Sequence, residues 1–308
     1  MAKDIKKNDI AKKTLKHYID LEFYANGVDA DLQALLDEVT TDCEEVIESQ
    51  KSYSTKDGYS VAYRAIKEKI DSFGNALEER LEKEAETVKN NEEKFLKWLY
   101  GAALAVAAVP LSKVLFAPVD GRDTIKAFAE RTKKNLLQSY DAALRSGYIF
   151  AKPSKEISSQ AKAALPQIKR GIQAGIQTAV PAAAKTTDSI IFAADALEVV
   201  WCTTLDGNVC LECASLSGQH FKSMSDAPSL PRHNCCRCVL LPAAMVSEPL
   251  PAYEEFIDSL STEDQIHVLG KNRYGLYKQG ISLQRFVNNG QTVPLKDLDI
   301  NSPVEIRR

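Results

Sequence analysis

Six of the seven cysteines of this 308-residue chain lie between Cys202 and Cys238, and a histidine lies among them. The motif Cys210-Leu-Glu-Cys213 separates two thiols by two residues, a spacing that lets both sulfurs point at one metal ion. His233 and Cys236 repeat this spacing downstream. Cys236 and Cys238 would face the same side of an extended chain, because side chains alternate along a strand.

The segment therefore offers five candidate metal ligands, which are Cys210, Cys213, His233, Cys236 and Cys238. They compete for the four positions of a tetrahedral ion, and thiolates together with imidazole select zinc over magnesium or calcium. Four protein ligands close the coordination sphere, whereas a catalytic zinc keeps one position open. We therefore predict a structural zinc; free or redox-sensitive thiols and a catalytic metal are the alternatives.

Other chemistries fit the segment less well. A thioredoxin-type pair would follow a strand and begin a helix in a βαβ unit, and the pattern does not indicate one. A Cys–His nucleophile needs one activated thiol without chelating rivals. The sequence contains no G-x-S-x-G, P-loop, H-E-x-x-H or G-x-G-x-x-G motif. We predict a protein that is not an enzyme, with a zinc-dependent nuclease or hydrolase and a zinc-ribbon-like DNA-binding module as alternatives.

The composition is that of a soluble globular protein, with 44% hydrophobic and 26% charged residues. A net charge of −3 gives no reason to expect binding of the whole molecule to nucleic acid or an anionic membrane. The N-terminal MAKDIKKNDIAKKT lacks the apolar stretch of a secretory signal, so we expect synthesis in the cytoplasm, where thiols stay reduced. An odd number of cysteines also disfavours complete pairing as disulfides.

The elements that must position the cysteine segment are mainly helical. From Asp29 to about Ala108 apolar residues recur at three- and four-residue steps, which predicts long amphipathic helices separated by a loop at 53–60. Another helix is predicted from Ile125 to Gly147, and a loop at 150–159 leads to a helix rich in small residues. Gly171, Gly175, Ala179 and Ala183 are four residues apart there, so another helix could approach closely, within the chain or from another subunit.

Three further features concern proline, an apolar segment and the tail. Pro181 is expected to kink its helix or to begin a new segment. The apolar segment Trp98 to Val119 is too short for a membrane span and is interrupted by Pro110, so we expect a buried core helix, with contact to a partner or membrane as the alternative. Short helices are predicted in the tail, with a capping box formed by Thr262 and Gln265.

Two short apolar runs, EVVWCTT at 198–204 and RCVLLPA at 237–243, predict an antiparallel pair of strands around the cysteine loop. The predicted fold class is mainly α, with a long helical N-terminal region, a small α+β zinc-stapled unit with a short antiparallel sheet, and C-terminal helices. The predicted regions are 1–118 and 119–198, both helical, 199–246 with the metal motif, and a helical tail at 247–308 that packs on the zinc unit.

The order of residues around the cysteines resembles the Mu F-like phage head morphogenesis family, whose members are minor head, or minor capsid, proteins. The positions that carry the resemblance are Trp201, Thr203, Asp206, Val209, Cys210, Cys213, Leu216, Gly218, Phe221, His233, Cys236, Arg237, Cys238 and Pro242. The tail at 265–287 is also similar, and the likeness covers about 199–287. The sequence AAKTTDS stands where the family often has Arg-Thr-Glu, and Asn234-Cys235 replaces the Pro-Asn after the histidine.

This resemblance implies a virion protein present in a few copies inside the capsid near the portal, after synthesis in the host cytoplasm. The implied role is head morphogenesis together with genome packaging and DNA ejection. The implied partners are the portal protein and other head proteins. Packaged DNA, and more remotely a membrane met during ejection, are further partners that the resemblance leaves open.

Overall fold

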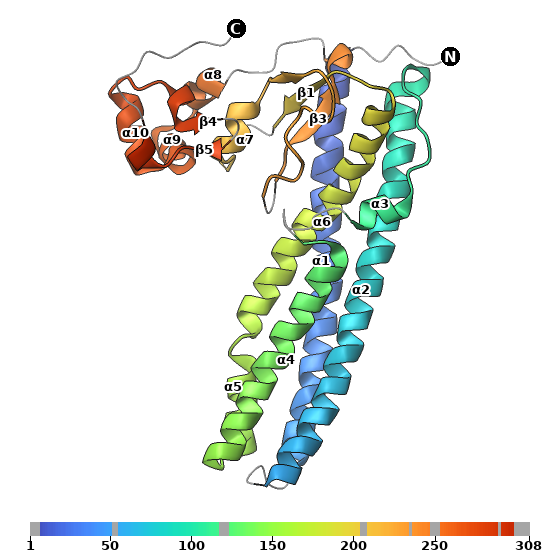
Figure 1. Cartoon of the computed structure of the whole chain (residues 1–308), viewed down its shortest axis with the longest axis vertical. Coiled ribbons are helices and arrows are strands. Elements are labelled where there is room, and N and C mark those ends of the chain that lie inside the picture. Colours follow the sequence, from blue (N-terminus) through green and yellow to red (C-terminus); the bar gives the residue numbers. More distant parts are fainter. Residues whose placement is uncertain are drawn as a thin grey trace.

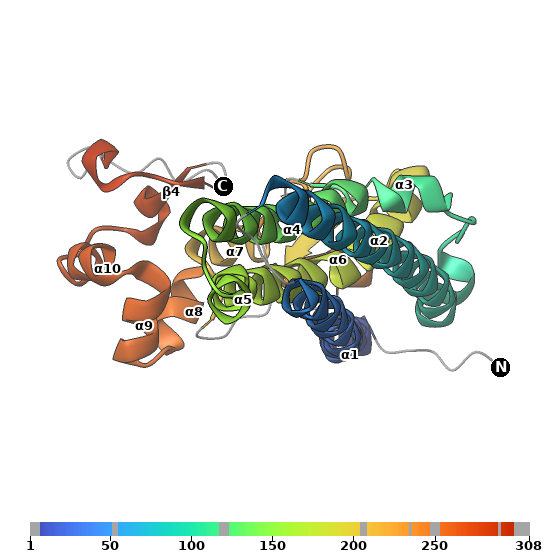
Figure 2. The same ribbon diagram turned by 90° about the horizontal axis from the view of Figure 1, so that it is seen from below.

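A computed structural model describes residues 7–50, 55–116, 123–203, 208–233, 236–246, 253–288 and 291–298. Long helices lie side by side in an elongated bundle, and a small sheet with short helices lies across one end of it (Figure 1). Figure 2, which looks along the bundle, shows the C-terminal helices to one side of it. The mainly α fold with a small antiparallel sheet is therefore confirmed.

The bundle is built from helices with continuous apolar stripes. Helix α2 packs along α4, and α1 packs along both α6 and α2. The fully buried side chains recur at helical spacing, as Leu32 and Leu36 do on α1 and Ile66 and Ile70 do on α2. The bundle helices are α1 (Lys7–Ser49), α2 (Lys56–Tyr100), α4 (Ile125–Phe150), α5 (Ser154–Lys162) and α6 (Leu165–Ala194).

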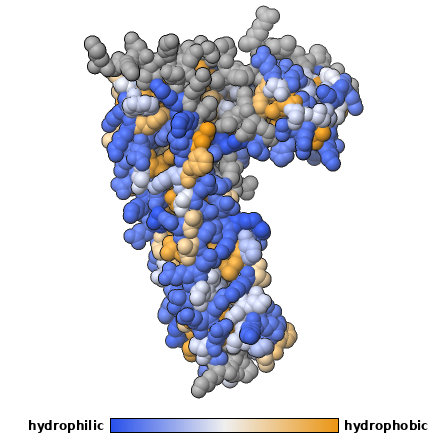
Figure 3. All heavy atoms as spheres, turned by 180° about the vertical axis from the view of Figure 1, so that it is seen from behind, coloured by the Kyte–Doolittle hydropathy of each residue, from blue (hydrophilic) through white to orange (hydrophobic). Residues whose placement is uncertain are grey.

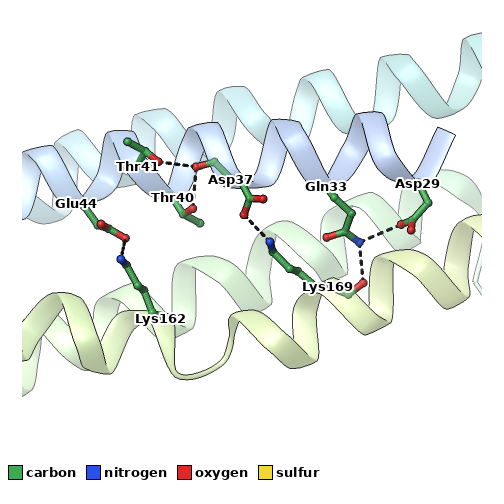
Figure 4. Close-up of polar contacts among 8 residues, drawn as sticks. All are labelled: Asp29, Gln33, Asp37, Thr40, Thr41, Glu44, Lys162 and Lys169. Atoms are coloured by element: carbon green, nitrogen blue, oxygen red, sulfur yellow. Dashed lines mark hydrogen bonds and ion pairs between the residues drawn. The ribbon is translucent and has the colours of Figure 1, made fainter. Parts of the chain in front are cut away.

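Polar contacts fix how α5 and α6 lie against α1 (Figure 4). Lys169 pairs with Asp37 at 2.6 Å and Lys162 pairs with Glu44 at 2.5 Å. The amide of Gln33 donates a hydrogen bond to the Lys169 carbonyl oxygen at 3.0 Å. Partly exposed pairs contribute at most about 1 kcal/mol each, so the apolar stripe stabilises this contact while the polar groups select its register.

Several predicted boundaries were wrong because local capping decides where a helix begins or ends. Residues 56–60, predicted as loop, belong to α2, since the Thr55 side chain accepts a hydrogen bond from Gly58 N at 3.1 Å and caps the helix. Residues 53 and 54 lie outside the described part. Helix α4 passes Gly147 and ends at Phe150, where Ala151 adopts a left-handed conformation with φ 49°. Helix α5 occupies most of the predicted loop at 150–159.

The apolar segment from Trp98 onward does not form the expected buried helix. Helix α2 ends at Tyr100, because Gly101 takes a positive φ of 56° and its N–H bonds to the Lys97 carbonyl. The chain continues as a 3-10 turn, an extended stretch and the short α3 (Leu111–Leu115). Trp98 and Phe116 are 58% and 75% exposed. Among the residues described, no helix is both long and apolar enough to span a membrane.

The small residues of α6 predicted that another helix could approach it closely. This is so at Gly175 but not at Gly171. A Cβ on Gly175 would lie 2.3 Å from ring atoms of Phe128 on α4, whereas a Cβ on Gly171 would meet nothing within 4 Å. The close packing at Gly175 is thus within the chain. The helix is one element from Leu165 to Ala194 with Pro181 inside it, so no new segment begins at the proline.

Alanine substitutions at these two glycines are expected to have opposite effects. Gly175→Ala should lower the free energy of unfolding by about 1–3 kcal/mol, because Phe128 must move out of a packed core. Gly171→Ala should leave stability unchanged or raise it by up to about 1 kcal/mol, since alanine favours an exposed helical position. Urea unfolding of both variants measures the difference. Equal stability of Gly175→Ala and the native chain would contradict the packing.

The small sheet follows α6 directly. Strands β1 (Val199–Cys202) and β3 (Val239–Pro242) pair antiparallel, with Trp201 opposite Leu240. This confirms the predicted pair. Strand β2 (His220–Phe221), not predicted, pairs with the other edge of β1. The short helix α7 (Leu211–Leu216) lies between β1 and β2 along the chain.

The tail forms short helices, as predicted, with two local differences. The helices are α8 (Tyr253–Ser259), α9 (Thr262–Leu269) and α10 (Lys271–Lys278). The N-cap of α9 is Ser261, which accepts from Asp264 N at 3.1 Å, while buried Gln265 donates to the Ile257 carbonyl at 2.9 Å; the predicted capping box is wrong. The sequence SLQRFVNNG at 282–290 favours a further short helix, but the chain forms a 3-10 turn there (Leu283–Phe286). This turn leads into the antiparallel pair of β4 (Val287–Asn288) and β5 (Gln291–Thr292).

The helices on both sides of residue 118 belong to the same bundle, since α2 contacts α4 and α6 extensively. The tail reaches the sheet unit through α7, which contacts α8, β4 and β5. One of these contacts is the hydrogen bond from Thr292 N to the Glu212 carboxylate at 2.8 Å.

The bundle surface is largely hydrophilic in Figure 3, with apolar side chains gathered in limited patches.

Candidate metal centre

The first pair of thiols lies at the beginning of α7. Cys210 is the N-cap of this helix, and its sulfur accepts a hydrogen bond from Cys213 N at 3.3 Å. The two-residue spacing then brings Cys213 Sγ to the same side as Cys210 Sγ, because the helical turn folds the chain back. Cys213 is 2% exposed, and Cys210 is partly buried.

The histidine arrives from the long loop that precedes β3. His233 Nε2 lies 3.1 Å from Cys210 Sγ and 3.1 Å from Cys213 Sγ. These three ligand atoms lie within 4.8 Å of one another. The loop therefore brings one imidazole nitrogen to both sulfurs of the C-x-x-C motif.

The remaining two thiols come from the residues that enter β3. Cys236 and Cys238 are 3% and 0% exposed, and their sulfurs lie within 4.8 Å of each other and of Cys213 Sγ. The two side chains do face the same side, as their spacing predicted. Cys213 belongs to both groups of three, so all five predicted ligands meet around its sulfur.

The sulfurs lie so close together that the pKa values of the four thiols shift in opposite directions. Hydrogen bonds from Cys213 lower the pKa of Cys210 to about 5, with His233 acting in the same direction. Contacts with Cys213 and Cys238 hold the pKa of Cys236 far below its usual value, while Cys210, Cys236 and Cys238 raise that of Cys213 far above it. For Cys238 the contact with Cys213 lowers the pKa, but Cys236 and burial outweigh it and raise the pKa to about 12.

The opposite pKa shifts have a simple physical cause. Buried thiolates repel one another, so protein groups alone do not stabilise all four thiols in the charged form. A bound cation removes the conflict, because a coordinated thiol is deprotonated outright. The described side chains therefore form a Cys/His cluster that could hold a metal ion.

Other residues that the sequence singled out lie away from the cluster's ligand atoms or outside the described residues. Cys43 is fully buried in the bundle core, as its position in the helical stripe predicted. Cys202 is buried in β1. His220 is a surface residue, with Nδ1 3.2 Å from a Glu198 carboxylate oxygen, and His267 is also exposed. Cys235 and the pair Asp206-Gly207, a sequence that favours a turn, lie outside the described part.

Two polar residues lie next to the cluster, Thr203, which the sequence marked only as a motif position, and Lys185, to which the sequence gave no role. Cys238 Sγ lies 3.2 Å from Thr203 Oγ1, and Lys185 Nζ, on α6, donates a hydrogen bond to the carbonyl oxygen of Cys236. Lys185 is 2% exposed. The sequence offered one signal, since Lys185 and Asp188 are the only charged residues between Gly171 and Ala194. Both are buried, although charged residues are usually exposed.

A buried polar network crosses the bundle near the same end of α6. His17 Nε2 lies 2.6 Å from a Glu92 carboxylate oxygen, and Tyr18 donates to Asp188 at 2.8 Å. Their other oxygens, Glu92 Oε1 and Asp188 Oδ1, are buried and have no further hydrogen-bond partner in the described part of the chain. Burial raises the pKa of Glu92 to about 7, and burial with the nearby Glu92 raises that of Asp188 well above its usual value. The two carboxyl groups thus retain a proton between them in the neutral range.

The candidate metal centre is therefore a largely buried cluster between the bundle, the sheet and α7, and its possible ligands come from two separate stretches of the chain. No protein-family model, curated protein or solved structure matches this chain. The function of the cluster is accordingly argued from its own residues and their arrangement.

Proposed function

We propose that the cluster binds one structural zinc ion and that the protein is a phage minor head protein, which acts in head morphogenesis near the portal. The observation that carries the first part is the convergence of Cys210, Cys213, His233, Cys236 and Cys238 on one buried place. The second part is supported by the order of motif residues from Trp201 to Pro242 and by the long helical bundle that precedes it.

The donor set and its spacing support zinc. Two sulfurs bound to one tetrahedral zinc at about 2.3 Å each lie about 3.8 Å apart. Within each group of three, the candidate ligand atoms lie within 4.8 Å of one another, and small side-chain movements bring such atoms to that spacing. Thiolate and imidazole donors select zinc or a similar soft ion over magnesium and calcium.

The same geometry supports a structural ion rather than a catalytic one. Cys213, Cys236 and Cys238 are almost completely buried, which leaves little access for a substrate. Five donors surround the place where four suffice, so an open coordination position would be filled by the protein itself. Binding of such an ion contributes about 10 kcal/mol or more to the folding of a small unit.

The bundle supports an assembly role in physical terms. Its long helices extend far beyond the metal unit at one end of the bundle (Figure 1) and present the extended surface that contacts with neighbouring subunits require. The metal holds the loops of the small unit, and the helices provide the area for contacts. Portal protein and other head proteins are the partners that the motif suggests.

Native mass spectrometry of the purified chain, alone and mixed with the portal protein of its phage, tests both parts. We expect one zinc per chain, a complex with the portal, and no zinc-dependent hydrolysis of DNA by the loaded protein. Folded protein without stoichiometric metal would exclude the zinc centre. A zinc-loaded chain that is absent from virions and does not bind the portal would exclude the head role while leaving the centre intact.

A further inference from the structure

Lys185 lies at the junction between the bundle and the metal centre. Its side chain is 2% exposed, and its Nζ donates a hydrogen bond to the carbonyl oxygen of Cys236. The same Nζ lies 5.5 Å from the centre of the Tyr18 ring on α1. One ammonium group therefore contacts both the loop that carries two ligands and the first helix of the bundle.

A buried ammonium group is costly unless negative charge lies nearby. The polar partner of Lys185 Nζ among the described residues is the carbonyl oxygen of Cys236, which carries no full negative charge. Asp188, one turn further along α6, accepts a hydrogen bond from Tyr18 at 2.8 Å, and burial with the nearby Glu92 raises its pKa well above its usual value. The hydrogen-bond partners of Asp188 are Tyr18 and Glu92 rather than the lysine. The sulfurs of the candidate metal centre are a source of negative charge on the other side of Lys185.

The charge of a loaded centre is negative for either choice of ligands. Three thiolates and one neutral imidazole around a zinc ion carry a net charge of −1, and four thiolates carry −2. A carbonyl that belongs to a ligand residue and accepts a bond from an ammonium group also fixes the orientation of that ligand. Such outer partners of metal ligands commonly change metal affinity by about 10- to 100-fold.

We propose that Lys185 is a positioning residue that balances the charge of the metal–thiolate centre and couples its occupancy to the helical bundle. This inference rests on the zinc centre proposed above. An ion in the centre fixes the position of Cys236, so the hydrogen bond from Lys185 to its carbonyl oxygen then holds the Cys236 loop on α6. Without the ion fewer bonds hold this loop, and the contact between the sheet unit and the bundle weakens.

The test compares Lys185→Met, which keeps the length of the side chain but removes its charge, with Lys185→Arg, which keeps the charge. Zinc affinity is measured by competition with a chromophoric chelator, and Tm is measured with and without zinc. We expect Lys185→Met to bind zinc at least about tenfold more weakly and to show a smaller zinc-induced rise in Tm. Lys185→Arg should recover most of both.

Lys89 offers a matched control, since it is a second buried lysine, 8% exposed, whose partner Glu93 is 3.1 Å away. Lys89→Met should lower Tm equally with and without zinc and should leave zinc affinity unchanged. Zinc affinity and a zinc-induced rise in Tm that are the same in Lys185→Met and the native chain would overturn the role of Lys185 while leaving the metal centre intact. A native chain that does not bind zinc would remove the centre itself, and this inference with it.

Hydrogen exchange of the unsubstituted protein provides a readout that does not depend on a variant folding. Zinc should slow amide exchange in the part of α6 around residues 180–188, because the lysine then ties this turn to the loaded centre. The far end of the bundle, around Leu36 and Ile66, should be unaffected. Equal exchange around Lys185 with and without zinc, in protein that binds the ion, would overturn the coupling.

Discussion

Replacing Cys213 with serine is expected to abolish stoichiometric metal binding and to unfold the unit formed by the sheet and α7, while the helical bundle remains. Cys213 is the residue whose sulfur belongs to both groups of candidate ligands, and among the other four described candidates no three ligand atoms lie within 4.8 Å of one another. The lost binding free energy is on the order of 10 kcal/mol, far more than one buried side chain contributes by packing. Elemental analysis and near-UV circular dichroism, which reports the environment of Trp201, measure the two effects.

Cys202 provides the matched control for this prediction. It is a buried thiol in the same unit, 2% exposed in β1, and burial raises its pKa to about 11, so it is an inert thiol. Cys202→Ala should cost about 1–2 kcal/mol of stability and leave one metal per chain. If Cys213→Ser retained its metal with native affinity, the cluster around this sulfur would not be the binding site.

Glu92→Gln is expected to stabilise the protein in mildly alkaline solution, although it removes a buried hydrogen-bonded carboxyl group. Burial raises the pKa of Glu92 from 4.5 to about 7, and Asp188 beside it is shifted in the same direction. The folded protein therefore holds protons that the unfolded chain releases. The stability that this proton binding contributes is fully present below about pH 4.5 and is lost as the pH rises through about 7.

The size of this effect follows from the pKa of Glu92. Because folding raises this pKa from 4.5 to about 7, the free energy of unfolding falls by about 3 kcal/mol between mildly acidic and alkaline pH. A glutamine is neutral at every pH and still offers an oxygen and an amide to the neighbours. Urea unfolding at pH 5 and pH 8 should therefore show a smaller pH dependence for Glu92→Gln, with the variant more stable than the native chain at pH 8.

The adjacent Glu93 should behave in the opposite way. Burial alone would raise its pKa, but hydrogen bonds from Val109 N at 2.7 Å and from Lys89 at 3.1 Å outweigh this and lower it. Its carboxylate therefore stabilises the fold above the unfolded pKa, and this stability is lost in acid. Glu93→Gln should destabilise the protein at pH 8. If Glu92→Gln and Glu93→Gln changed the free energy of unfolding equally and with the same sign, the pair of Glu92 and Asp188 would not be the source of the pH dependence.

Local patterns in the sequence were enough to predict the kind of element and the candidate ligands. The step of three and four residues that joins Leu32 to Leu36 predicts a helix face, because the period of a helix is a local property. The gap between Cys210 and Cys213 likewise indicates a shared ion through a single turn of chain. Boundaries were less well predicted, since one hydrogen bond to Thr55 or one positive φ at Gly101 decides them.

By itself the sequence determined a mainly helical chain, two short apolar strands and five metal-ligand candidates, because each of these is recognised from residues close together in the chain. Only the tertiary structure decided that Cys213 is common to both ligand groups, that Lys185 bonds to Cys236, and that Glu92 lies beside Asp188. These contacts join residues far apart in the chain. No local period in the sequence encodes such pairs. They form because the packed bundle excludes water, so buried polar groups must form hydrogen bonds with each other.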